Sequence, residues 1–136
     1  MVVDASVVVS RLVPDDVHHE TSRRWLMQHV ADGGLLISPT LLLAEVAGAV
    51  ARRTGKPRLG RRALAAVLRL PALRLVPVDE VLAHAAANLA GQFRVRGADA
   101  VYIAAAAVLG VPLATWDLEQ RERAAHIVEV FVPEDQ

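Results

Sequence analysis

Four acidic residues stand inside or directly beside apolar segments, where a charged side chain is costly unless something compensates it. Asp4 follows the first apolar run, and Glu45 lies within the segment LLLAEVA. Asp99 stands at the start of a strongly apolar stretch, and Asp117 ends the segment LATWD. Carboxylates in such settings are suited to hold a hard cation through their oxygen atoms, provided that the fold brings them together.

The surrounding pattern alternates strand-like apolar runs with helix-like segments. We expect strands at Met1–Val3, Leu35–Ile37, Leu73–Val78, Leu113–Thr115 and Ile127–Val132. We expect helices at Ser6–Leu12, Val17–Val30, Leu41–Arg53, Arg61–Leu70, Asp79–Phe93 and Asp99–Leu109. Ser6 is expected to cap the first of these helices. Such alternation is typical of βαβ units around a mainly parallel sheet that is covered on both faces. The sequence therefore predicts one three-layer α/β/α domain over residues 1–136.

In sheets of this kind, ligands bind beyond the carboxyl ends of the strands. Asp4 and Asp117 follow strands, and Glu45 and Asp99 lie on helices that could open at the same rim. Converging carboxylates repel one another, and each is pushed toward protonation unless a cation is present. A divalent cation with oxygen ligands, Mg²⁺ or Mn²⁺, resolves that conflict and can activate a water for attack on a phosphodiester. The four residues together therefore predict metal-assisted phosphodiester hydrolysis.

Each of the four residues also has an ordinary structural interpretation. Asp4 and Asp117 are suited to cap the helices that follow them, and Asp99 to be favoured by the dipole at its helix start. Glu45 could extend to solvent or pair with an arginine. The functional interpretation rests on the four residues jointly, because the elements that carry them are expected to converge on one side of the sheet.

The composition limits the classes of protein to consider. The chain has 136 residues, 54% of them apolar, which suits one folded domain and excludes a disordered chain. Fifteen basic and fifteen acidic residues give no net charge, and the absence of cysteine excludes disulfides and thiolate sites. No signal peptide is visible, and Gly110 and Pro112 interrupt the uncharged stretch 100–116. We therefore expect a cytoplasmic protein without a membrane span.

Four stretches of the chain, VVDAS, SPTLLLAEV, RGADAVYIAAA and LATWD, resemble the PIN-domain ribonucleases, specifically the VapC-type toxins of bacterial toxin–antitoxin pairs. The resemblance implies RNA cleavage by a metal-activated water, with Mg²⁺ or Mn²⁺ in an acidic pocket. It implies catalytic roles for Asp4, Glu45, Asp99 and Asp117, with the three aspartates as metal ligands. It also implies a homodimer, and a VapB-like antitoxin that inserts a C-terminal segment near the pocket.

Several further residues are candidates for supporting roles. The resemblance places Ser6 and Thr115 at hydroxyl positions that support the acidic residues through hydrogen bonds. Arg94 and Arg96 lie just before the third acidic residue, where they could contact RNA phosphates or an antitoxin carboxylate. A stronger basic run extends from Arg52 to Arg62, and it is either a solvated face or a surface that follows RNA phosphates.

Other functional classes have less support in the sequence. A PIN-like domain that binds RNA or a protein without cutting remains the alternative to the ribonuclease. A haloacid-dehalogenase phosphatase would need an aspartate at the position of Ser6, and a receiver domain a late lysine, whereas Lys56 is the only lysine. No histidine lies near the four acidic segments in sequence, so a histidine general base is not expected. Trp116 is expected to pack in the core or to edge the pocket.

Overall fold

The computed structural model describes residues 1–134, and its centre is a parallel sheet of five strands. The strands are β1 (Val2–Val3), β2 (Leu36–Pro39), β3 (Leu73–Val76), β4 (Leu113–Ala114) and β5 (Val130–Phe131), in the order β3-β2-β1-β4-β5. In the centre of the sheet, Val2 pairs with Ile37 of β2 on one side and with Leu113 of β4 on the other. The carboxyl ends of β1 and β4 therefore lie side by side.

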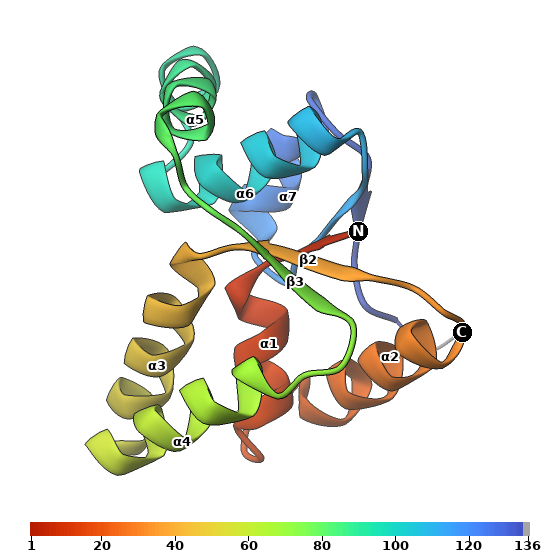
Figure 1. The fold of residues 1–136 in the computed structure, drawn as a ribbon, viewed down its shortest axis with the longest axis vertical. Coiled ribbons are helices and arrows are strands. Elements are labelled where there is room, and N and C mark those ends of the chain that lie inside the picture. The colour runs from red at the N-terminus through yellow and green to blue at the C-terminus, as the bar shows by residue number, and fades with distance from the viewer. Residues whose placement is uncertain (135–136) are drawn as a thin grey trace.

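Helices cover both faces of this sheet, as the three-layer prediction requires. They are α1 (Ala5–Leu12), α2 (His19–Ala31), α3 (Leu41–Thr54), α4 (Pro57–Leu68), α5 (Glu80–Phe93), α6 (Gly97–Leu109) and α7 (Leu118–Ala124). In the view of Figure 1, α1 to α4 lie below the sheet and α5 to α7 above it. The predicted three-layer α/β/α fold is confirmed.

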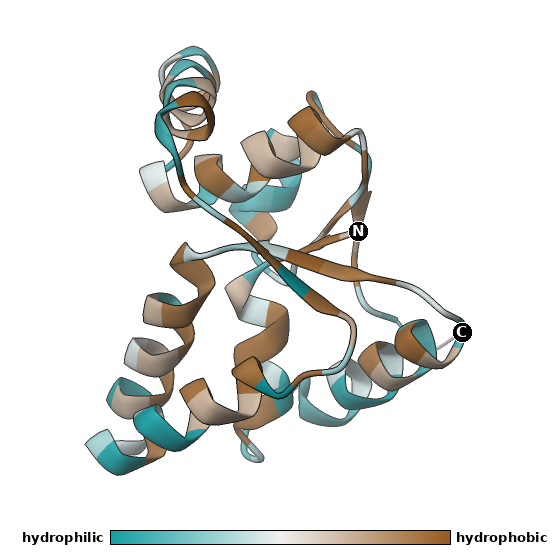
Figure 2. Ribbon diagram, in the orientation of Figure 1, coloured by the Kyte–Doolittle hydropathy of each residue, from teal (hydrophilic) through white to brown (hydrophobic). Residues whose placement is uncertain are grey.

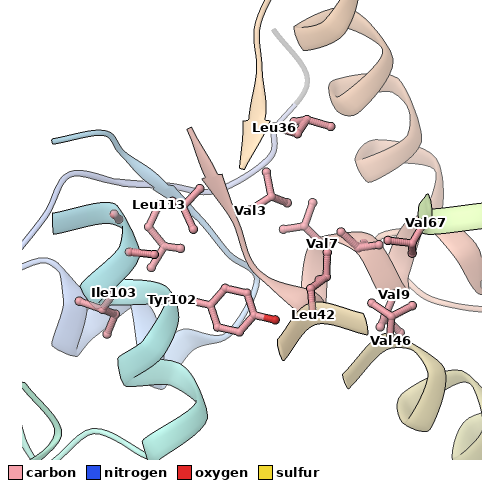
Figure 3. Packing of buried hydrophobic residues seen from close by; sticks show 14 of the residues in the cluster. Val3, Val7, Val9, Leu36, Leu42, Val46, Val67, Tyr102, Ile103 and Leu113 are labelled. Atoms are coloured by element: carbon pink, nitrogen blue, oxygen red, sulfur yellow. The ribbon is translucent and has the colours of Figure 1, made fainter. Parts of the chain in front are cut away.

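The core explains why the sequence is so apolar at its strands and at α6. Val2, Val3 and Leu113 are fully buried in the middle strands, and Ile103 packs on them from α6. Figure 3 shows Val3 and Leu113 of the strands with Ile103 of α6, and Figure 2 shows the mainly apolar colouring of the central strands. The short strands β1 and β4 are thus rigidly held, and so are the residues that follow them.

Several predicted boundaries were wrong. The first helix is capped by Asp4, not Ser6, because the Asp4 carboxylate accepts a hydrogen bond from the Ser6 amide. The helix expected from Arg61 begins at Pro57, since proline is well tolerated in a first helical turn. The sixth helix begins at Gly97, two residues before Asp99. The seventh helix was expected only as an unbounded segment that Asp117 could cap, and the last strand covers two residues instead of six.

No helix among residues 1–134 combines the length and apolar character needed to span a membrane. The longest uncharged stretch is divided as expected: α6 ends at Leu109, and Gly110 adopts a left-handed conformation with φ of 65°. The chain then turns into β4, so this stretch forms a buried helix and a buried strand.

Candidate active site at the carboxyl edge of the sheet

Asp4 is buried at the junction of β1 and α1, and all of its described polar contacts are hydrogen bonds. Its side chain is part of a residue that is only 6% exposed. Oδ2 accepts hydrogen bonds from the Ser6 amide at 2.9 Å and from the Thr115 hydroxyl at 3.2 Å. Oδ1 accepts a longer one, at 3.4 Å, from the side-chain amide of Gln120. These contacts fix the carboxylate in one orientation.

The two predicted hydroxyl residues connect this junction to the loop after β4. Ser6 Oγ and Thr115 Oγ1 lie 3.3 Å apart, and the Trp116 amide donates to Ser6 Oγ at 3.0 Å. The Asp117 amide donates to Thr115 Oγ1 at 3.1 Å. The hydroxyls therefore join the β1–α1 junction to the β4–α7 loop through hydrogen bonds.

Arg96 brings Asp99 and Asp117 together. Its Nε donates to Asp99 Oδ2 and its Nη2 donates to Asp117 Oδ2, each at 2.7 Å. Asp99 lies in the first turn of α6, and Asp117 caps α7 by accepting a hydrogen bond from the Gln120 amide at 2.9 Å. One cationic group therefore already occupies the position on which these two carboxylates converge.

Glu45 is anchored from the opposite layer of the fold. It lies on α3, and its Oε2 accepts a hydrogen bond of 2.5 Å from the hydroxyl of Tyr102. Figure 3 shows Tyr102 reaching from α6 across the end of β1 toward the start of α3, where Leu42 lies. Tyr102 is fully buried, so core packing fixes its hydroxyl and, through the hydrogen bond, the carboxylate of Glu45.

The pKa shifts place the acidic residues in one electrostatic cluster. Burial raises the pKa of Glu45, and the carboxylates of Asp4 and Asp99 raise it further against the opposing hydrogen bond from Tyr102. Burial also raises the pKa of Asp99 and outweighs the opposing effect of Arg96, while the carboxylates of Asp4 and Asp117 add smaller contributions in the same direction as burial. Each of the four carboxylates thus lies close enough to another to affect its ionisation.

Asp117 and Arg96 shift in the direction expected of a strong ion pair. Burial alone would raise the pKa of Asp117, but hydrogen bonds from the Gln120 amide and from Arg96 outweigh it and lower the pKa. The hydrogen bonds to Asp117 and Asp99 raise the pKa of Arg96. Asp117 and Arg96 are therefore both charged at neutral pH.

The donor set is chemically suited to magnesium but does not surround a metal ion. Within residues 1–134, no group of three or more histidine or acidic side chains is arranged so that it could hold a metal ion. Asp99 and Asp117, however, converge on one cationic group. Because Mg²⁺ is commonly held by one or two carboxylates together with waters and substrate phosphates, this pair fits its requirements. Asp4 as a third ligand stays a prediction.

Two polar residues of the site were not anticipated from the sequence. Tyr102 stands three residues after Asp99, so the helical spacing alone places both on one face of α6. Gln120 stands three residues after Asp117, which is the spacing of a capping box, and its buried side chain contacts Asp4. Both spacings are visible in the printed sequence, but the partners across the sheet are not.

His18 and Trp116, which are far apart in the sequence, stack their rings on each other. Their rings stack with centroids 3.7 Å apart and planes inclined by 9°. Trp116 Nε1 also donates to the hydroxyl of the buried Ser22 at 2.8 Å. Although no histidine is near the acidic segments in sequence, the start of α2 places His18 against Trp116, the residue next to Asp117. Trp116 is half-buried and packs against the core, as one of the two interpretations predicted.

The other basic candidates lie apart from the carboxylates. Arg94 ends α5 in a left-handed conformation and borders a separate hollow with Glu122 and His126. The basic run 52–62 divides between the end of α3 and the start of α4. Of the two arginines expected next to the acidic residues, only Arg96 contacts them within the described part of the chain.

The fold and site together define an α/β domain with an acidic cluster at the carboxyl edge of a parallel sheet. The family description "PIN domain" matches residues 1–126. The chain therefore belongs to the PIN-domain family, which the sequence resemblance had indicated. No curated protein sequence matches the chain.

Solved structures with the same fold include several toxins. VapC20 of Mycobacterium tuberculosis, a sarcin–ricin-loop-cleaving toxin, superposes with a TM-score of 0.76 and 23% identity, covering 95% of this chain and 97% of VapC20. FitAcB of Neisseria gonorrhoeae gives 0.72 and 23%, covering 97% and 96%. VapBC2 of Rickettsia felis, bound to a promoter DNA fragment, gives 0.73 and 12%, covering 96% of each chain. At these identities the likeness establishes the fold alone.

Proposed function

We propose that this chain is a metal-dependent endoribonuclease that hydrolyses RNA phosphodiesters, with Asp4, Glu45, Asp99 and Asp117 as its catalytic carboxylates. The observation that supports this best is the position of Arg96 between Asp99 and Asp117. A cation is stable at this point of the acidic cluster, and a divalent cation has the same electrostatic reason to bind there. Membership of the PIN-domain family supports the same chemistry.

The four carboxylates have different roles in the proposed reaction. Asp99 and Asp117 would hold Mg²⁺ or Mn²⁺, which supplies an acidified water and neutralises charge at the phosphate when it is bound. Asp4 provides a fixed negative charge, held by Ser6 and Thr115. Glu45 is suited to accept the proton of the attacking water, because its pKa is raised above the ordinary range. The proton would pass from the water oxygen to Glu45 as that oxygen bonds to phosphorus, while the bond from phosphorus to the leaving ribose oxygen breaks and that oxygen takes up a proton from solvent.

We further propose that the protein is the toxin of a VapBC-type pair and acts in the cytoplasm as a homodimer. The supporting comparison is with complexes such as VapBC2, in which a PIN toxin and its antitoxin bind promoter DNA together. An antitoxin that places a basic side chain between Asp99 and Asp117 would replace Arg96 there and block a metal ion. Co-expression with a short upstream reading frame tests this, because a cognate antitoxin would co-purify and abolish cleavage.

A cleavage assay tests the enzymatic proposal. Purified protein is incubated with structured RNA, such as intact ribosomal RNA, in Mg²⁺ or Mn²⁺, with and without a chelator. We expect discrete cleavage products that chelation removes, and a loss of at least about 100-fold for Asp99→Asn. Asp79→Asn, the same change at the exposed cap of α5, is the matched control and should cleave like the wild type. An inactive wild type, or an Asp99→Asn variant with full activity, would favour the PIN-like domain that binds without cutting.

A further inference from the structure

A groove leaves the acidic cluster between α1 and α3. It has a volume of about 360 Å³, and Ser6 and Glu45 border it on the side of the carboxylates. Arg52 and Arg53 border it at the other end. Its walls contain small side chains, such as that of Ala49, so that a bulky chain can approach the helix backbones closely. The groove therefore connects the proposed site of cleavage to positive charge.

The spacing on α3 sets the length of this path. Glu45, Ala49 and Arg52 recur at intervals of four and three residues, which places them on one face of the helix. Seven residues of α-helix rise by about 10 Å, and the guanidinium of Arg52 lies back over Gly48, within that length. Arg52 is thus placed one or two nucleotides away from a phosphate that lies at the carboxylates.

The two arginines at the end of the groove differ in their contacts with other residues. Arg53 forms an ion pair with Asp16, so its charge is already compensated. Arg52 has no hydrogen bond or ion pair to any residue in the range 1–134. Its guanidinium lies back over Gly48, where a Cβ atom would stand only 3.0 Å from Nη1. Because Gly48 lies one helical turn nearer to Glu45, the free charge of Arg52 is directed toward the acidic cluster.

We propose that the groove between α1 and α3 takes the RNA strand next to the cleaved bond, and that Arg52 binds a phosphate of that strand. The inference rests on the proposed ribonuclease function, which it extends by a specific substrate contact. A phosphodiester chain suits this path because one phosphate lies at the metal-binding carboxylates while the next meets an uncompensated guanidinium. An acidic peptide fits less well, because its carboxylates would lie near those of the protein and would be repelled by them unless a metal ion offset the charge.

The test measures binding rather than cleavage. Fluorescence anisotropy follows a labelled single-stranded oligoribonucleotide of mixed sequence, in Ca²⁺, a hard cation that offsets the charge of the carboxylates in place of Mg²⁺, at several salt concentrations. We expect Arg52→Gln to weaken binding by about fivefold or more and to lower the salt slope by about 0.7, the loss of one phosphate contact in a single strand. Arg61→Gln, a matched arginine of the same basic run that lies outside the groove, should bind within twofold of the wild type.

A second variant distinguishes the loss of the Arg52 contact to RNA from a loss of stability of the fold. Gly48→Ala introduces a Cβ that displaces the Arg52 guanidinium, while alanine is the better residue inside a helix. We expect weaker RNA binding with an unchanged or raised Tm. The inference is overturned if the wild type does not bind the RNA, or if Arg52→Gln binds equally well with an unchanged salt slope. If Arg52→Gln loses binding and the wild type does not cleave, the groove stands and the catalytic proposal fails.

Discussion

Burial raises the pKa of Asp99, and its partner of opposite charge, Arg96, lowers it. Burial and two neighbouring carboxylates raise its pKa, and Arg96 compensates only part of this. An acid whose pKa is raised in the folded state stabilises the fold below its ordinary pKa, and that stability is lost as the pH rises through the folded-state value. The ionised carboxylate therefore destabilises the metal-free protein at neutral pH.

We accordingly expect Asp99→Asn to leave the Tm of the metal-free protein unchanged or to raise it at neutral pH. The gain should vanish when the solution is acidified below the ordinary pKa of aspartate, because both proteins are then neutral at this position. Thermal unfolding in a chelator measures both quantities. Asp79→Asn is the control, since Asp79 caps α5 on the surface and asparagine caps equally well. A clear fall in Tm at neutral pH would mean that Asp99 is chiefly a structural ion-pair partner.

Arg96 is expected to compete with a metal ion for Asp99 and Asp117. Its side chain is 58% exposed, so each of its two ion pairs is worth about 0.2–1 kcal/mol. Their loss in Arg96→Gln should therefore tighten Mg²⁺ or Mn²⁺ binding by roughly two- to thirtyfold, as measured by titration calorimetry. Arg94→Gln should bind the metal like the wild type. Weaker metal binding by Arg96→Gln would show instead that the arginine holds the carboxylates in position for the ion.

The roles of single residues were only partly predictable. Asp4 and Asp117 were open to two interpretations, as helix caps or as members of an acidic cluster, and the structure shows both at once. The two interpretations are compatible because a helix that starts at a strand end lies at the functional edge of the sheet. The bonds of Glu45 to Tyr102 and of Asp99 to Arg96 were not predicted, since they depend on side-chain conformations that follow from packing.

Among the elements, the α3–α4 pair depends on one glycine. A Cβ at Gly60 would lie 2.6 Å from the carbonyl oxygen of Ala47, which is backbone and cannot easily move. We expect Gly60→Ala to destabilise the protein by about 1–3 kcal/mol despite the better helix propensity of alanine. Chemical denaturation measures the free energy of unfolding. Because α3 carries Glu45, cleavage should fall as well.

Gly91→Ala is the matched control for this prediction. Gly91 is an exposed residue within α5, and a Cβ there would meet nothing within 4 Å. Alanine should therefore stabilise this helix by up to about 1 kcal/mol. Equal free energies of unfolding for Gly60→Ala and Gly91→Ala would contradict the prediction. They would mean that α3 and α4 can move apart without cost.

The existence of most elements was predictable, while their ends were not. The apolar runs identified all five strands, because strands buried on both faces have few polar residues. The start of α4 was missed, and the extent of α7 was not given, because their first turns are polar, so apolar periodicity is weak there. Pro57 and the Asp117–Gln120 capping spacing were the usable signals for these starts.

For the whole molecule, the sheet order decides where function lies. A parallel sheet directs the carboxyl end of every strand to one edge, which is why four distant segments, around Asp4, Glu45, Asp99 and Asp117, could be expected to lie near one another. The homodimer stays a prediction, since contacts between two copies depend on surface shape rather than on the fold. Exposed apolar side chains such as Val81 and Val108 are available for such contacts.

Metal binding should couple the site to the stability of the entire fold, with a defined pH dependence. A ligand that binds only the native state raises its stability, by about 2.7 kcal/mol at one hundred times the dissociation constant. Since the pKa values of Glu45 and Asp99 are raised, protons compete for these carboxylates at a higher pH than for ordinary acids. The metal-free Tm should therefore lose a contribution as the pH rises through these values, while the increase in Tm caused by Mg²⁺ should grow. Thermal unfolding over a grid of pH and Mg²⁺ concentration measures both trends, with Asp99→Asn as the variant in which the Mg²⁺ effect is reduced at every pH. An increase in Tm that is equal in acidic and neutral solution would mean that the ion binds away from these carboxylates.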